Sequence, residues 1–179
     1  MTAFHRGEHR APLPAGAREL LHPSAGMPVV EFPREVIQMR PEILVHMIAM
    51  GKVDAHAATE AFGGSAKRFV VLSSGDVYRA YGRFSGVESG PVENGLLTED
   101  SALRNVLYPY RAQAKSREEL AYYYDKILVE RQFLQGTNVP ATILRLPKVY
   151  GPGGNSDLRS VYAYRKHSNC GGRMGMWRT

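Results

Sequence analysis

The chain has 179 residues, of which 44% are hydrophobic and 22% charged, a balance typical of a globular protein with a proper core. No apolar run approaches the roughly 20 residues that a membrane-spanning helix needs, and the single cysteine, Cys170, excludes an internal disulfide and supplies no metal site by itself. The net charge of +6 indicates either anionic ligands or simple solubility, because the basic residues are spread along the chain without a nucleic-acid-binding motif.

The pattern of apolar residues and breaks predicts alternating strands and helices. In chain order, the expected elements are the end of a strand at Thr2–His5, a short helix at Pro33–Arg40, a buried parallel strand at Ile43–Ala49, an alanine-rich helix at Val53–Phe62, a second buried strand at Lys67–Ser73, a helix at Arg117–Gln135 and a third strand at Pro140–Leu146. Residues 1–28 otherwise show little periodicity. Such alternation predicts an α/β fold with a doubly wound parallel sheet.

The segment from Gly75 to Ser116 is too long for an ordinary connection between two elements. It leaves the carboxyl end of a predicted strand, which is where ligands bind in open α/β sheets. We therefore expect this segment to be a substrate-binding loop or lid. A surface excursion without function is the alternative.

Tyr122 and Lys126 stand four residues apart in the predicted helix and would share one of its faces. A lysine ammonium close to a phenol favours the phenolate and lowers the tyrosine pKa from its ordinary value of about 10. Such a pair would serve as the acid/base of a carbonyl–alcohol redox site. The alternative is a helix whose aromatic residues pack inward while Lys126 lies in solvent, because three consecutive tyrosines make this spacing easy to reach by chance.

Three motifs follow one another along the chain. VVLSSGDVY ends at Tyr78, the Tyr122/Lys126 spacing is followed by Glu130, and LRLPKVYGPG ends at Gly153. In this order they resemble the extended short-chain dehydrogenase/reductase superfamily, and more narrowly its NAD-dependent epimerase/dehydratase family of nucleotide-sugar and related enzymes. The segment ILVHMIA is similar to the fourth strand of that family. The resemblance covers roughly residues 1–158 and implies a Rossmann-like sheet.

The resemblance also implies a role for each matching residue. Tyr122 would be the catalytic acid/base, Lys126 would lower its pKa and hydrogen-bond the nicotinamide ribose, and Ser74 would orient the reacting oxygen. Asp76 occupies a position that holds a second acid in dehydratase members. The residues expected to contact an NAD or NADP cofactor are Arg6, Met47, Ile48, Ala49, Ser73, Tyr122, Lys126, Leu146, Pro147 and Lys148.

The start of the chain departs from the family pattern. The fingerprint G-x-x-G-x-x-G, which should join a strand to a helix, does not occur in the sequence. The first βα unit is therefore expected to be missing, and its strand is central in the family's sheet, so neighbouring strand edges would be left open. His5 and Arg6 stand where an acidic residue would select NAD. Arg6 therefore slightly favours NADP, with a solvated arginine as the alternative.

We expect residues 1–158 to form a partial NAD(P)-binding domain, followed by a poorly ordered tail at 159–179. The expected function is that of an NAD(P)-dependent epimerase/dehydratase-type oxidoreductase or isomerase, acting on a nucleotide-sugar-like substrate with impaired cofactor binding. A non-catalytic Rossmann-fold binding or regulatory protein is the alternative. We further expect a cytoplasmic protein, dimeric by family analogy, without a metal site or a membrane or nucleic-acid partner. His46, inside an apolar strand, should be a hydrogen-bonded core residue rather than a ligand.

Overall fold

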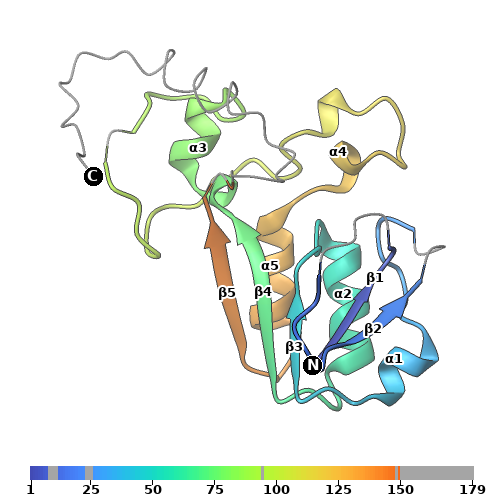
Figure 1. The fold of residues 1–179 in the computed structure, drawn as a ribbon. Helices are drawn as coiled ribbons and strands as arrows, with labels where there is room; N and C mark the ends of the chain where they lie inside the picture. Colours follow the sequence, from blue (N-terminus) through green and yellow to red (C-terminus); the bar gives the residue numbers. More distant parts are fainter. Residues whose placement is uncertain (8–11, 23–25, 94, 148, 150–179) are drawn as a thin grey trace. The chain divides into compact units, whose positions relative to one another are not determined.

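The computed structural model describes residues 1–7, 12–22, 26–93, 95–147 and 149. The chain divides into a first compact unit, Met1–Leu146, and a second unit that begins at Pro147. All helices and strands reported below belong to the first unit (Figure 1). The expected domain boundary at residue 158 and the expected tail lie outside the described residues.

The described elements alternate between strands and helices, as the sequence predicts. In chain order they are β1 (Thr2–His5), β2 (Arg18–Leu21), α1 (Arg34–Gln38), β3 (Ile43–His46), α2 (Lys52–Phe62), β4 (Arg68–Ser74), the 3-10 helix η1 (Gly75–Val77), α3 (Arg79–Phe84), the 3-10 helix η2 (Arg111–Gln113), α4 (Leu120–Tyr123), α5 (Lys126–Gln135) and β5 (Ala141–Leu146). Four elements lie where none was expected: β2, whose residues are mostly exposed and carry no alternating pattern, and η1, α3 and η2 in the long segment 75–116.

The strands form two parallel sheets. The larger has the order β3-β4-β5, with Val45 paired to Val70 and Val70 paired to Thr142, and the smaller consists of β1 and β2. The α/β class and the parallel strands are thus confirmed. The doubly wound Rossmann-like sheet is not, because the described strands do not join into one sheet.

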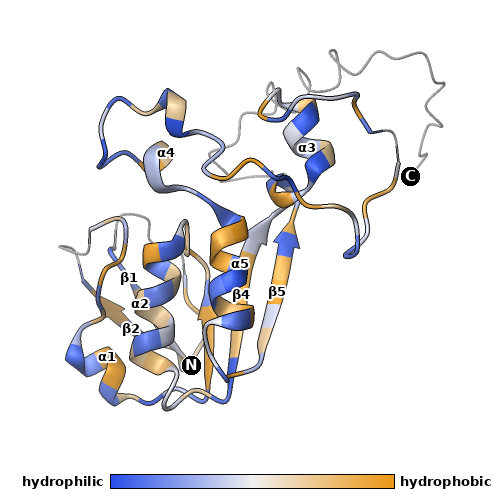
Figure 2. Ribbon diagram, turned by 180° about the vertical axis from the view of Figure 1, so that it is seen from behind, coloured by the Kyte–Doolittle hydropathy of each residue, from blue (hydrophilic) through white to orange (hydrophobic). Residues whose placement is uncertain are grey.

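Helices α2 and α5 lie side by side on one face of the larger sheet, as the two opposite views show (Figures 1 and 2). Side chains alternate along β4, so Phe69 and Val71 point toward these helices and are buried. They pack in one core with Phe62 of α2 and Phe133 of α5. Burying a side chain of this size stabilises the fold by about 1.5–3 kcal/mol.

The opposite face of the larger sheet carries apolar side chains. Ile43, Val45 and Leu144 are 60%, 54% and 42% exposed, and no described helix crosses β4 and β5 on this side (Figure 1). The prediction of a buried strand at Ile43–Ala49 is therefore wrong in two respects. The strand ends at His46, and within the described part of the chain it is a half-exposed edge strand.

The predicted helix at Arg117–Gln135 is interrupted. Helix α4 ends at Tyr123 and α5 begins at Lys126, while Tyr124 (ψ 122°) and Asp125 (φ −163°) are extended. The Asp125 carboxylate accepts a hydrogen bond from the backbone N–H of Ile127 and so caps α5. The prediction that Tyr122 and Lys126 share one helical face is wrong for this reason.

The long segment 75–116 has structure of its own. It contains η1, α3 and η2, and an antiparallel bridge between Tyr78 and Leu103 ties its middle back to its beginning. Because it follows β4, it covers the carboxyl end of the central strand of the larger sheet, where a ligand site is expected.

Candidate functional site

Two of the predicted catalytic residues follow β4 directly. Ser74 is the last residue of the strand, and Asp76 lies two residues later in η1. The Ser74 hydroxyl accepts a hydrogen bond of 3.3 Å from the Asp76 backbone N–H, which caps this short turn. The strand end therefore sets the distance between the serine and the acid.

The Asp76 carboxyl is buried beside two tyrosines. Its Oδ2 accepts a 3.3 Å hydrogen bond from the Tyr110 hydroxyl, while its Oδ1 has no hydrogen-bond partner among the described residues. Burial raises the pKa of Asp76, and the Tyr124 hydroxyl and the charge of Arg104 act in the opposite direction. A buried acceptor without a partner is costly unless it meets a ligand or a proton.

Tyr124 is the tyrosine that lies next to Ser74 and Asp76. Its ring centroid is 5.4 Å from that of Tyr110. Burial, followed by the negative charge of Asp76, raises the pKa of the Tyr124 hydroxyl, and the Ser74 hydroxyl lowers it. Tyr124 is therefore held in its protonated form, as a hydrogen-bond donor inside the cluster. We call Ser74, Asp76, Tyr110 and Tyr124 the serine–tyrosine cluster.

The other two tyrosines of the triplet have different surroundings. The Tyr122 ring stacks against the Arg111 guanidinium, at 4.6 Å from Cζ to the ring centroid, and its carbonyl accepts a hydrogen bond from Arg111 Nε. The pKa of Tyr123 is raised by burial and by the charge of Asp54, whereas Arg6 lowers it. The break after α4 thus gives Tyr124, and not the predicted Tyr122, to the cluster.

Lys126 lies at the start of α5 with its ammonium buried. The Nζ atom donates to the carbonyl of Ala49, at 2.5 Å, and to that of Leu72, at 3.1 Å. Burial lowers the pKa of Lys126, and the negative charges of Asp76, Asp54 and Glu130 oppose this change. The lysine therefore joins the segment that follows β3 to strand β4.

Ser73 is committed to a structural network on the helix-covered face. Its hydroxyl donates to Glu130 of α5 at 2.6 Å, and Arg145 of β5 donates to both oxygens of the same carboxylate at 3.0 and 2.9 Å. Arg145 also reaches the Tyr78 hydroxyl at 3.3 Å. Such a fork-shaped pair fixes both partners in direction, so this network holds α5 against β4 and β5.

The remaining residues predicted to contact a cofactor are dispersed. Met47 and Ile48 are exposed just beyond β3, and Ala49, which follows them, is buried. Leu146 ends β5, and Arg6 lies near the Tyr123 hydroxyl. Pro147 belongs to the second unit, and Lys148 lies outside the described residues.

Lys126, Met47 and Ile48 carry groups that suit the ribose and nicotinamide end of the cofactor. Lys126 Nζ has three N–H donors, two of which are used by carbonyls, and the third has no partner among the described residues. Exposed Met47 and Ile48 supply apolar surface nearby. A ribose hydroxyl and a nicotinamide ring need these kinds of groups.

The pyrophosphate end fits less well. The first turn of α2 is occupied by its own Asp54, which accepts hydrogen bonds from the backbone N–H groups of Met50 and Gly51 at 3.2 and 2.9 Å. The carboxylate of Asp54 thus lies at the start of α2, where its negative charge would oppose the binding of a pyrophosphate. We therefore expect weak cofactor binding.

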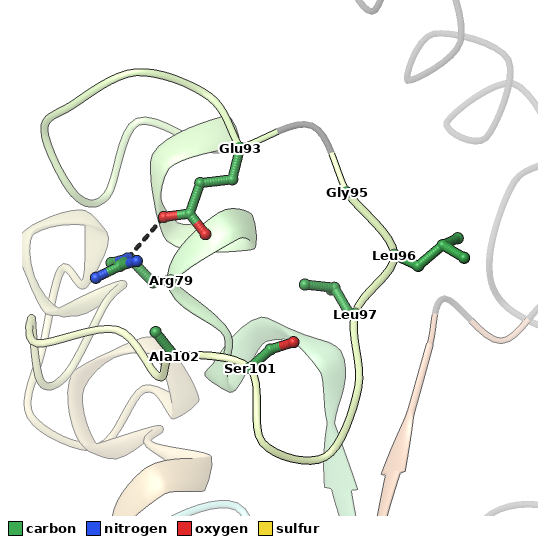
Figure 3. Close-up of a pocket in the computed structure, with 7 residues that line it drawn as sticks. All are labelled: Arg79, Glu93, Gly95, Leu96, Leu97, Ser101 and Ala102. Atoms are coloured by element: carbon green, nitrogen blue, oxygen red, sulfur yellow. Dashed lines mark hydrogen bonds and ion pairs between the residues drawn. The ribbon is translucent and has the colours of Figure 1, made fainter.

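A shallow cavity of about 280 Å³ lies elsewhere on the long segment, lined by Arg79, Glu93, Gly95, Leu96, Leu97, Ser101 and Ala102 (Figure 3). Within it, Arg79 Nε donates to Glu93 at 2.6 Å, so the positive charge of the arginine is balanced by the carboxylate. The cavity shares no lining residue with the serine–tyrosine cluster. In the described ranges, no group of three or more His, Cys, Asp or Glu side chains is placed to hold a metal ion, and no helix is long and apolar enough to cross a membrane.

Comparisons with protein-family models, curated proteins and solved structures find no match to this chain. The roles proposed below therefore depend on the geometry and on the motif resemblance. Sequence reasoning missed Tyr110 and Tyr124 as members of the cluster, and Arg104 and Asp125 as its frame. One signal was present: an aspartate directly before the amphipathic run KILVE is typical of a helix N-cap, and it marks the start of α5.

Proposed function

We propose that this chain is an NAD(P)-dependent epimerase/dehydratase-type oxidoreductase or isomerase that acts on a nucleotide-sugar-like substrate and binds its cofactor weakly. The observation that carries the proposal is the meeting of Ser74, Asp76 and Tyr124 at the carboxyl end of β4. A hydroxyl, a carboxyl and a phenol at one point suit proton transfer to and from a substrate alcohol or carbonyl.

Three residues of the cluster have distinct roles in this proposal. The Ser74 hydroxyl hydrogen-bonds the reacting oxygen and orients it. The neutral Tyr124 hydroxyl donates a hydrogen bond and then its proton to that oxygen, and the phenolate that this leaves takes a proton back in the reverse direction. Asp76, whose Oδ1 has no partner within the described part of the chain, is the acceptor that a second substrate hydroxyl meets.

Lys126 has the role of holding the cofactor next to the cluster in this proposal. Two of its three N–H groups are used by the carbonyls of Ala49 and Leu72, and the third would hydrogen-bond a ribose hydroxyl of the cofactor. When bound, the nicotinamide would supply the hydride chemistry. The choice between NAD and NADP rests on Arg6, whose basic side chain slightly favours NADP.

Substitution of single tyrosines tests the proposal. We expect Tyr124→Phe to lower turnover by roughly 100-fold to 10,000-fold, the usual contribution of a general acid or base. Tyr122→Phe keeps the ring that stacks on Arg111 and should retain turnover. The measurement is conversion of a panel of nucleoside-diphosphate sugars, followed by chromatography of the sugars and by nicotinamide absorbance, because an isomerase leaves the cofactor unchanged overall. Loss in Tyr122→Phe with full activity in Tyr124→Phe would instead support the assignment by four-residue spacing.

Cofactor binding provides a second readout. Titration of NADPH and NADH, followed by nicotinamide fluorescence, should give affinities weaker than micromolar, and a micromolar affinity would contradict the expected weak binding. A non-catalytic binding or regulatory protein is the rival function, favoured by the contacts that Lys126 and Tyr124 already make inside the protein. Absence of turnover for every nucleoside-diphosphate sugar at saturating cofactor would favour that rival.

A further inference from the structure

A buried ion pair lies where the chain breaks between α4 and α5. Arg104 Nη2 and Asp125 Oδ1 are 2.8 Å apart, and the two side chains are 1% and 0% exposed. The same carboxylate accepts hydrogen bonds from the backbone N–H groups of Ile127, at 3.0 Å, and Tyr108, at 2.6 Å. Asp125 therefore joins the long segment to the first turn of α5.

Arg104 extends this connection to the strand end. Its Nε donates to the carbonyl of Asp76 at 3.1 Å, and its Nη1 donates to the carbonyl of Val106. The Arg104 guanidinium thus bridges Asp76, which belongs to the serine–tyrosine cluster, and Asp125, which follows Tyr124. The planar fork of arginine fixes direction as well as distance, which a lysine cannot do.

Stability alone is a weak reason for such a pair. The cost of removing two charges from water is comparable to their attraction in the interior, and well-packed apolar replacements are often neutral or stabilising. The backbone beside the pair is also strained, because Tyr108 has a φ of +52°, in the left-handed region that non-glycine residues seldom adopt. Strain of this kind persists where surrounding contacts over-determine the conformation.

We infer that Arg104 and Asp125 are positioning residues that break the helix after Tyr123 and thereby present Tyr124, rather than Tyr122, to Ser74 and Asp76. In an uninterrupted helix each residue turns by about 100°, so Tyr122 and Lys126 would face the same side and Tyr124 would point away from them. The catalytic meaning of this inference rests on the proposed function, whereas the placement of Tyr124 can be tested by itself.

The test follows Tyr124 directly, by nuclear magnetic resonance of tyrosines labelled at the ring carbon that carries the hydroxyl, with Tyr124→Phe for assignment. In the unmodified chain the Tyr124 signal should stay in its neutral position through the pH range near 10 where an ordinary tyrosine ionises. In Asp125→Asn, which keeps the size of the side chain but removes its charge, Tyr124 should become exposed and titrate in that ordinary range.

Phe133→Leu is the matched control, because it creates a cavity in the core without touching the cluster. A Tyr124 signal that changes in Asp125→Asn but not in Phe133→Leu supports the inference. An unchanged signal in folded Asp125→Asn overturns it, and so does an equal change in Phe133→Leu. Should Asp125→Asn fail to fold, Arg104→Lys, which keeps the charge and loses the fork, replaces it under the same outcomes.

Turnover separates this inference from the proposed function. If Asp125→Asn moves the Tyr124 signal while Tyr124→Phe retains full turnover, the positioning role stands and the catalytic role of Tyr124 fails. If Tyr124→Phe abolishes turnover while Asp125→Asn leaves both the signal and turnover unchanged, the proposed function stands and the positioning role fails.

Discussion

His46 is a single buried residue whose charge state the fold controls. Its ring lies edge-on to Phe32 and Phe133, with centroids 6.2 and 6.1 Å away. Burial, followed by the positive charge of Lys126, lowers the pKa of His46 to about 4. The expected core position is confirmed. The expected hydrogen bonding is confirmed in part, because the ring hydrogen-bonds the backbone of Asp54, whereas Nε2 has no partner in the described part of the chain.

We predict that His46 makes the fold less stable in acid. Its folded pKa of about 4 lies below the ordinary value of 6.5, so between these values the unfolded chain binds more protons and the free energy of unfolding falls as the pH falls. The loss should reach on the order of 3 kcal/mol at and below the folded pKa. Urea denaturation across this range should show the slope in the unmodified chain and lose it in His46→Leu.

The exposed His56, substituted as His56→Gln, is the control for this experiment and should keep the slope. The same slope in His46→Leu as in the unmodified chain would assign the pH dependence to other groups.

The tyrosine triplet shows what local spacing can and cannot determine. The sequence predicts the candidate acid/base in a short stretch before Lys126, and Ser74 and Asp76 lie together as their spacing from the strand requires. The spacing rule selects Tyr122 because it assumes a continuous helix. Asp125 interrupts that helix with the help of Arg104, which is 21 residues away in the chain, and no local pattern reveals a partner at such a distance.

At the scale of elements, the start of α2 lies against the end of α4. Gly51 precedes α2, and a Cβ atom placed on it would lie 2.5 Å from the carbonyl oxygen of Tyr123. The contact is to backbone, which cannot rotate away. Only glycine allows this approach, and the position of Tyr123 in turn sets where the chain leaves α4 toward Tyr124.

We predict that Gly51→Ala destabilises the fold by about 1–3 kcal/mol, the usual cost of forcing an extra methyl group into a packed contact. Chemical denaturation measures the change. Gly64→Ala, just beyond the other end of α2, is the matched control because a Cβ there meets nothing within 4 Å. Equal stability of the two variants would show that the Tyr123 backbone can shift without cost.

The elements that the sequence predicts best have strong local signals. The helix expected at Val53–Phe62 is observed at Lys52–Phe62, and the strand expected at Lys67–Ser73 at Arg68–Ser74. Glycines after the helix and apolar residues in the strand fix these limits. The prediction that the strand at Ile43–Ala49 is buried is wrong because burial depends on neighbours in space, which a run of apolar residues does not specify.

At the scale of the whole first unit, the apolar face of the larger sheet formed by Ile43, Val45 and Leu144 stands out. The register aligns these residues on the side away from α2 and α5. Apolar area of this kind promotes association of protein molecules in solution. The motif resemblance would instead imply a dimer formed through the helix predicted at Arg117–Gln135, of which α5 is the longer part, so the two surfaces give different expectations.

We predict that the double variant Val45→Lys and Leu144→Lys shifts the chain toward monomer, because charge on this face opposes its burial. Sedimentation velocity at rising protein concentration measures the association. Leu134→Lys, which places one lysine on an exposed position of α5, is the control and should leave association unchanged. Monomer formation in Leu134→Lys alone would assign association to the helix.

The serine–tyrosine cluster is built from parts with unequal resistance to local opening. Ser74 and Asp76 follow β4, which is hydrogen-bonded to a strand on each side, whereas Tyr110 and Tyr124 come from segments outside the sheet. Segments with fewer buried backbone contacts open at a smaller free-energy cost than the centre of a sheet. We therefore expect the segments that carry the two tyrosines to move away from Asp76 at a smaller free-energy cost than the opening of β4. The rate at which a ligand reaches the unpaired oxygen of Asp76 would then depend on how often these segments open, and not on the volume of a permanent cavity.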